Sequence, residues 1–292
     1  MQPAIRHPVI VMIVSLACYG LMDMLLKRAS IAMGAVSALF WRNVLAGVAL
    51  AGFALVRRSR WPSPPALRLH VLRSVVIAAM AVLFFWGLVR VPMAEAMALS
   101  FISPLVALAL AAAILGERIR QRALAGCAVS LSGVVLIGLV GGTRGDSSWA
   151  GLAAVLGSAV LYGWNLVIQR QQALAASPLE AVTFQTVLVA LILAPPTAVI
   201  GQAPPLDLWP VLAGAAGLGV LSAMLATSAY ARAEAQALAP LEFTAFIWAA
   251  LFGFIGFGEV PGWWTYAGCA LIVAGSAVAT GDRATKKPAP AP

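Results

Sequence analysis

Two stretches of the chain repeat one another, namely ILGERIRQRALAGCAVSLSG at 114–133 and GFGEVPGWWTYAGCALIVAG at 256–275. At a spacing of 142 residues they share, in order, Gly116/Gly258, Glu117/Glu259, Ala125/Ala267, Gly126/Gly268, Cys127/Cys269, Ala128/Ala270 and Gly133/Gly275. Chance matching of two Ala- and Leu-rich segments is the weaker explanation, because the shared residues include rarer types. The copies differ in one respect: three arginines follow the glutamate of the first copy only.

The composition around the repeat is that of a membrane protein. Hydrophobic residues make up 62% of the 292 residues, charged residues only 10%, and the mean hydropathy is +0.95. Soluble domains average about 45–50% apolar and about 25% charged residues. A lipid core demands apolar helices of about 20 residues, so we expect an all-α integral membrane protein with ten transmembrane helices. The predicted spans are 9–26, 35–56, 71–89, 93–115, 123–141, 149–169, 179–200, 207–230, 237–257 and 262–281.

The net charge of +9 is explained by topology rather than by a nucleic-acid partner. Ten spans place fourteen Lys and Arg residues on one side and only Lys27, Arg28, Arg90 and Arg144 on the other. Cytoplasmic loops carry the excess of basic residues. We therefore expect both termini in the cytoplasm, a disordered cytoplasmic tail at 282–292, and the lipid bilayer as partner instead of nucleic acid.

The 142-residue spacing predicts two five-helix halves, at 1–143 and 144–281. Five is odd, so the second half enters the membrane from the opposite side, which makes the repeat inverted. This explains the arginines: the first Gly-Glu motif faces the cytoplasm and the second faces outward. Phe101 then corresponds to Phe243, and Tyr19 corresponds to Tyr162 with a one-residue shift. Inverted halves that rock about a site at the bilayer midplane are typical of secondary transporters.

No metal or cofactor is expected. Cys18, Cys127 and Cys269 all lie in apolar runs, and His7 and His70 have no ligand spacing around them,. The sequence contains neither a glycine-rich phosphate loop nor a constellation for catalysis. The chain is therefore expected to be no enzyme, and transport has to draw on an ion gradient or on the solute's own gradient.

The motifs ALFWRNVLAG, with Arg42 in the second span, and SPLVALALAAAILGERI, followed by a Gly-rich span, resemble the EamA-type permeases of the drug/metabolite transporter superfamily. The resemblance extends to about residue 281. It implies a secondary transporter of small metabolites in the cytoplasmic (inner) membrane, and within the family the chain is similar to bacterial aromatic amino-acid exporters. The alternatives are import or export of another small solute, such as a vitamin, nucleoside or quaternary ammonium drug, or a non-transporting membrane subunit.

The resemblance also implies that spans one, three, four, six, eight and nine surround a cavity, with spans five and ten outside. Small residues at helical spacing in spans five and ten indicate close helix packing. We read these two spans as scaffold or dimer surface, so that a monomer or a homodimer is expected.

Polar residues recur along one face of span six, at Ser158, Tyr162, Asn165 and Gln169. Lipid disfavours such a stripe, so it faces a cavity or another helix. Span one carries Ser15 and Tyr19 on a corresponding face. Interhelical hydrogen bonds, worth about 0.6 kcal/mol each, remain the competing explanation.

Two ionisable residues lie inside predicted spans. Glu242 is the candidate for the group that couples transport to protons or cations. The alternative is that it lies near the cytoplasmic interface, where it reaches water or pairs with Arg232 or Arg42. Arg42 is interpreted as structural, because span two is peripheral in the family and arginine extends readily to the interface.

Aromatic residues and prolines complete the candidate site. Aromatic side chains in cavity-forming spans offer stacking surfaces for an aromatic or cationic solute. Pro104 and Pro240 are candidate gating bends, with static kinks as the alternative. The substrate-binding candidates are Ser15, Tyr19, Trp86, Ser100, Phe101, Tyr162, Asn165, Tyr230, Glu242 and Trp248.

Overall fold

A computed structural model describes residues 8–56, 62, 64–103, 105–106, 109–110, 121–144, 148–173, 178–230 and 241–280, and these contain helices and no strands. The helices are α1 (Pro8–Met33), α2 (Ala35–Val56), α3 (Pro64–Leu88), α4 (Met93–Ser100), α6 (Gln121–Arg144), α7 (Trp149–Ala173), α8 (Pro178–Ile200), the 3₁₀ turn η1 (Leu206–Leu208), α9 (Trp209–Tyr230), α11 (Ala245–Phe257) and α12 (Trp263–Thr280). Within them, seven helices are long and apolar enough to cross a membrane. The all-helical membrane class is therefore confirmed, and ten spans stay a prediction, since 93–115 and 237–257 are only partly described.

Leaving aside the two partly described spans, most helix ends fall within a few residues of the prediction, and two do not. α1 continues to Met33, seven residues beyond the prediction, and ends where Gly34 adopts a φ of 81° that favours glycine,. α3 begins at Pro64 rather than at residue 71. Its first turns carry Arg68 and His70, which lower the local hydropathy, so that the apolar run of the sequence begins only after them.

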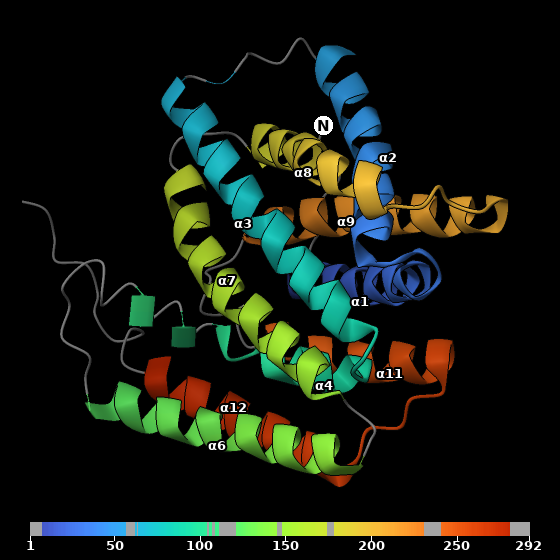
Figure 1. The fold of residues 1–292 in the computed structure, drawn as a ribbon. Helices are drawn as coiled ribbons and strands as arrows, with labels where there is room; N and C mark the ends of the chain where they lie inside the picture. Colours follow the sequence, from blue (N-terminus) through green and yellow to red (C-terminus); the bar gives the residue numbers. More distant parts are fainter. Residues whose placement is uncertain are drawn as a thin grey trace, which may run out of the picture.

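Three antiparallel helix pairs form the body of the molecule. α1 packs along α9, α3 along α7 and α2 along α8, and Figure 1 shows α3 and α7 side by side. Two of these pairs share a matched contact. Ser15 Oγ donates to the Ser222 carbonyl at 2.8 Å, and Ser158 Oγ donates to the Met80 carbonyl at 2.9 Å.

α6 and α12 form a separate pair along one edge of the molecule (Figure 1). Glycines bring their backbones together: a Cβ on Gly133 would lie 2.5 Å from the Gly268 carbonyl oxygen, and a Cβ on Gly268 2.8 Å from the Gly133 carbonyl oxygen. Gly275 lies against Gly126 in the same way. Residues from the two sequence repeats thus cross in antiparallel order.

Apolar side chains cover both the inside and the outside of this arrangement. Leu26, Leu39 and Leu212 are fully buried, whereas Leu55 and Val199 are 78% and 83% exposed. Exposed apolar side chains are what a lipid environment favours. The described helices therefore build a multi-pass membrane protein, in which polar groups in the interior are the exception and require an explanation.

Candidate functional site

Polar side chains from three helix pairs interact with one another among the apolar helices, some of them buried and some exposed. We call the following residues the polar cluster: Tyr19 and Asp23 on α1, Arg42 on α2, Arg73 on α3, Tyr162 and Asn165 on α7, and Glu242 just before α11. Tyr162 interacts electrostatically with Glu242, Tyr19 and Arg73, and Tyr19 with Arg42 and Asp23. The cluster therefore joins both sequence halves.

The α7 side of the cluster follows from helical periodicity. Ser158, Tyr162 and Asn165 lie on one face of α7, and this face turns toward α3. Arg73 Nε donates to Asn165 Oδ1 at 3.0 Å. Tyr162 keeps 40% of its surface exposed while Asn165 is buried, so the stripe combines an interhelical hydrogen bond with a partly exposed tyrosine.

The α1 side mirrors this arrangement. Ser15 is fully buried and exchanges hydrogen bonds with Ser222 of α9. Tyr19, one turn further along, lies within hydrogen-bonding reach of Ser222 and close to the Arg42 guanidinium. Ser15 thus secures the α1–α9 contact, and the Tyr19 hydroxyl belongs to the polar cluster.

Four other predicted residues make contacts with residues outside the cluster. Ser100 Oγ donates to the Ala96 carbonyl within its own helix turn. Phe101 meets its repeat partner Phe243 edge to face, with ring centroids 5.2 Å apart. Trp86 is 38% exposed and stacks under the Arg90 guanidinium at 3.7 Å.

Trp248, the fourth, lies on an apolar groove between α1 and α11. Its ring stacks on Phe252 with centroids 6.1 Å apart, and Gly20 of α1 lets the helices approach closely there. The groove holds about 230 Å³ and is lined by Ile13, Val14, Ala17, Cys18, Leu21, Trp248 and Phe252. None of these seven lining side chains is charged.

Three predicted residues lie outside the described part of the structure. Pro104 and Pro240 are not among the described residues, and of Tyr230 the side chain is not. Their roles therefore stay predictions. Glu242 is described and exposed, and its electrostatic contact is with Tyr162.

Arg73 was not among the predicted site residues. Sequence reasoning placed it at the cytoplasmic end of a span beginning at residue 71, whereas it lies nine residues inside α3. The same shift places His70 inside α3, where it is fully buried, stacks on Phe184 and has Nε2 3.2 Å from Glu180 Oε1. The helix-favouring residues from Pro64 onward were the sequence signal that could have indicated the earlier start of α3.

A second buried charge network ties one end of the bundle together. Gly258 ends α11 in the left-handed conformation at a φ of 69°, and the Glu259 amide bonds back to the Gly253 carbonyl,. This turn directs the Glu259 carboxylate to Lys27 Nζ, with which it forms an ion pair, and to the Met93 amide at 2.7 Å. The repeated Gly-Glu motif thus has a structural use here.

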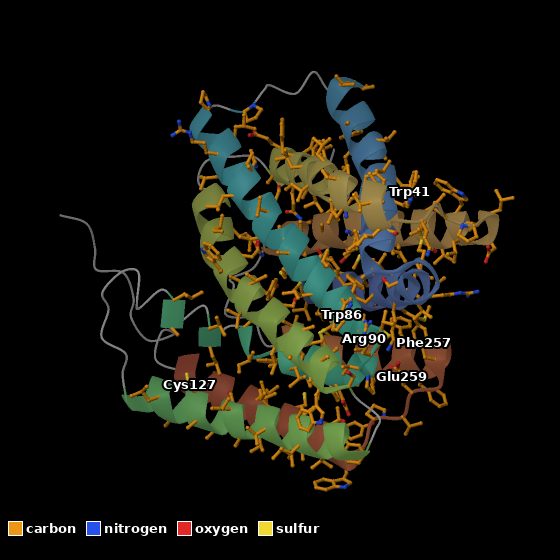
Figure 2. All side chains as sticks on the ribbon, viewed as in Figure 1. Trp41, Trp86, Arg90, Cys127, Phe257 and Glu259 are labelled. Atoms are coloured by element: carbon orange, nitrogen blue, oxygen red, sulfur yellow. The ribbon has the colours of Figure 1, made fainter. Side chains whose placement is uncertain are left out.

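Further contacts complete this end network. Lys27 Nζ also donates to the Val91 carbonyl at 3.0 Å and lies 4.9 Å from the centre of the Phe257 ring. Figure 2 shows Glu259 and Phe257 in the same region as Trp86 and Arg90. Nearby along α4, the buried Glu95 accepts hydrogen bonds from Trp264 Nε1 and Thr265 Oγ1. These contacts join α1, α4, α11 and α12.

Comparison with known proteins agrees with this architecture. A "Probable terminal-alkyne amino-acid exporter" of Streptantibioticus cattleyicolor is 38% identical over 120 residues, which cover 39% of this chain and 40% of that relative. The "Pseudopaline exporter CntI" of Pseudomonas aeruginosa is 24% identical over 277 residues, or 92% and 94% of the two chains. The chain thus spans less than half of the first relative and nearly all of the second.

A solved crystal structure shares the fold, with a TM-score of 0.62 at 22% identity, covering 96% of this chain and 99% of that one. The family model described as "EamA-like transporter family" matches residues 7–139 and again residues 149–281. The two regions matched by this family model confirm the expected EamA-type permease. The protein is a multi-pass membrane transporter of a small-molecule solute, and the chain belongs to the EamA-like transporter family.

Proposed function

We propose that this chain is a secondary transporter that exports amino acids, aromatic and other neutral ones foremost, across the cytoplasmic membrane by alternating access. The observation that carries the proposal is the polar cluster, in which Arg73 donates to Asn165 and Tyr162 interacts electrostatically with Arg73 and Tyr19 among apolar helices. Polar and ionisable groups at membrane depth mark solute or ion pathways. The two relatives named as exporters support the direction.

We further propose that residues 1–143 and 144–281 are inverted halves. The antiparallel crossing of repeat-related glycines in α6 and α12 supports this arrangement. So does the pairing of Ser15 with Ser222 on one side and of Ser158 with Met80 on the other, because a shift of 142 or 143 residues relates each member of one pair to a member of the other. Two nearly equivalent halves would present the polar cluster to either side in turn.

Glu242 is the proposed coupling group. Its carboxylate is exposed and acts electrostatically on Tyr162 of the cluster, so a proton or cation bound there would change the charge felt by the solute site. Pro104 and Pro240 are proposed as gating bends in the fourth and ninth spans. With both termini in the cytoplasm, the end network around Lys27 and Glu259 would face outward.

The proposal is tested by flux from proteoliposomes of the purified protein against empty liposomes. Labelled phenylalanine, tryptophan, threonine, methionine and a quaternary ammonium compound are compared with and without a pH gradient. Selective amino-acid flux supports the proposal, and its response to the gradient identifies proton coupling. Flux of the quaternary ammonium compound alone would show that the solute is not an amino acid. Absence of all flux would contradict transport of any of these solutes.

A further inference from the structure

The guanidinium of Arg42 is incompletely satisfied inside the bundle. Its Nε is buried and has no hydrogen-bond partner among the described residues, and its Nη2 donates to the thioether sulfur of Met22 at 3.3 Å. A guanidinium carries five N–H donors, and a thioether is a weak acceptor. Unmet hydrogen bonds on a buried charged group are costly, so this arrangement favours an anionic group that a ligand can supply.

A carboxylate of the protein lies near but does not complete the site. Asp23, 9% exposed, follows Met22 directly on α1 and interacts electrostatically with Arg42. Among the described residues no ion pair joins the two side chains. Tyr19, one helical turn before Asp23, presents its hydroxyl to the same two charges,.

On the side facing α9, the Arg42 guanidinium lies against the backbone of Gly219. A Cβ on Gly219 would overlap Arg42 Nη2 and lie 2.9 Å from Met22 Sδ. α9 therefore offers Arg42 no side chain at this point, and any added atom there would displace the guanidinium. Two residues earlier, a Cβ on Gly217 would meet no atom of the described residues within 4 Å, so a methyl group fits there without any shift.

From these contacts we infer that Arg42 and Asp23 form the headgroup site for a zwitterionic solute, with the carboxylate on the Arg42 guanidinium and the ammonium group on Asp23. Guanidinium–carboxylate pairs are bidentate and strong. A guanidinium and an ionised carboxylate together leave a zwitterion balanced, whereas a ligand with net charge would bury an unpaired charge. The inference rests on the proposed amino-acid transport and replaces the structural role expected for Arg42.

The first test uses the unmodified protein in detergent and measures its thermal unfolding midpoint. Phenylalanine, methionine and threonine are compared at equal concentration with their methyl esters, which lack the carboxylate, and their N-acetyl derivatives, which lack the ammonium group. We expect stabilisation by the free amino acids only. Equal stabilisation by the esters or by the N-acetyl derivatives, or none by any amino acid, would overturn the inference.

The second test uses variants. Arg42→Lys and Asp23→Asn keep the size of each side chain roughly constant, and we expect each to raise the dissociation constant for the stabilising amino acid at least about tenfold. Gly219→Ala should weaken binding as well, while its matched control Gly217→Ala should not. Unchanged affinity in Arg42→Lys and Asp23→Asn would overturn the inference. If a variant fails to fold, the ligand series on the unmodified protein decides.

Flux separates this inference from the proposed function. Binding of free amino acids without flux would contradict the proposed transport and leave the headgroup site standing. Flux of amino acids that is unaffected by Arg42→Lys and Asp23→Asn would leave transport standing and remove the headgroup site.

Discussion

At the level of single residues, the Asn165 amide is a hydrogen-bond partner of the Arg73 guanidinium. Its Oδ1 accepts from Arg73 Nε at 3.0 Å, and Arg73 interacts electrostatically with Tyr162. Losing a hydrogen bond to a charged group costs about 1.5–3 kcal/mol. We expect Asn165→Ala to raise the half-saturating solute concentration about tenfold or more in proteoliposome flux. The control is Gln169→Ala, because Gln169 is exposed one turn further along α7. Equal half-saturating concentrations in both variants would indicate that the Asn165 hydrogen bond serves helix packing only.

Glu242 is the second residue whose role a single change can test. Its carboxylate is the exposed acidic group that acts on Tyr162. We expect Glu242→Gln to abolish the pH dependence of flux while the thermal unfolding midpoint stays unchanged, because the amide cannot take up or release the proton. Asp207→Asn, on the exposed turn η1, removes a carboxylate away from the cluster and should leave the pH dependence intact. Persisting pH dependence in Glu242→Gln would remove Glu242 from the mechanism.

At the level of elements, the α6–α12 pair depends on glycines. A Cβ on Gly133 would lie 2.5 Å from the Gly268 carbonyl oxygen and 2.9 Å from Ile272 Cγ1. Overpacking a close contact costs about 1–3 kcal/mol, so Gly133→Ala should lower the thermal unfolding midpoint in detergent. Gly138→Ala is the matched control on the same helix, since its Cβ would meet the nearest atom only at 3.9 Å. Equal midpoints for the two variants would argue against this close crossing.

The helix boundaries show which parts of the fold the sequence predicts correctly and which it does not. Hydropathy located α2 and α7 well, because their first turns already consist mainly of apolar residues. It began α3 seven residues late, because Arg68 and His70 interrupt the apolar run although they belong to the helix. That error moved Arg73 out of the predicted site and to the cytoplasmic surface.

At the level of the whole molecule, the Lys27–Glu259 ion pair joins α1 to the end of α11 and, through the Val91 carbonyl and the Met93 amide, to the turn before α4. Removing one partner of a buried ion pair costs about 3–5 kcal/mol, because a buried charge is left unpaired. We expect Lys27→Met and Glu259→Gln each to lower the thermal unfolding midpoint by more than the double variant does. Additive losses would show that the two side chains do not act together.

The inverted arrangement of the halves makes a prediction of its own. Val56 and Val199 lie near the ends of α2 and α8, are repeat partners at a spacing of 143 residues, and are 84% and 83% exposed. In a background without Cys18, Cys127 and Cys269, we expect a membrane-impermeant maleimide to label Val56→Cys only from the cytoplasmic side and Val199→Cys only from outside. Labelling of both from one side would contradict the inversion.

The sequence by itself determined the membrane class, most of the span positions, the repeat and the family, because each of these is a local sum or a comparison along the chain. It also singled out Tyr19, Tyr162, Asn165 and Glu242, since a polar residue among apolar ones is visible without a fold. Only the tertiary structure decided which of these groups meet. Three contacts illustrate this: Arg73 with Asn165, Lys27 with Glu259, and Arg42 with Met22. The residues in each contact lie 20 to 232 positions apart in the chain. Hydropathy and residue spacing cannot predict which distant residues meet.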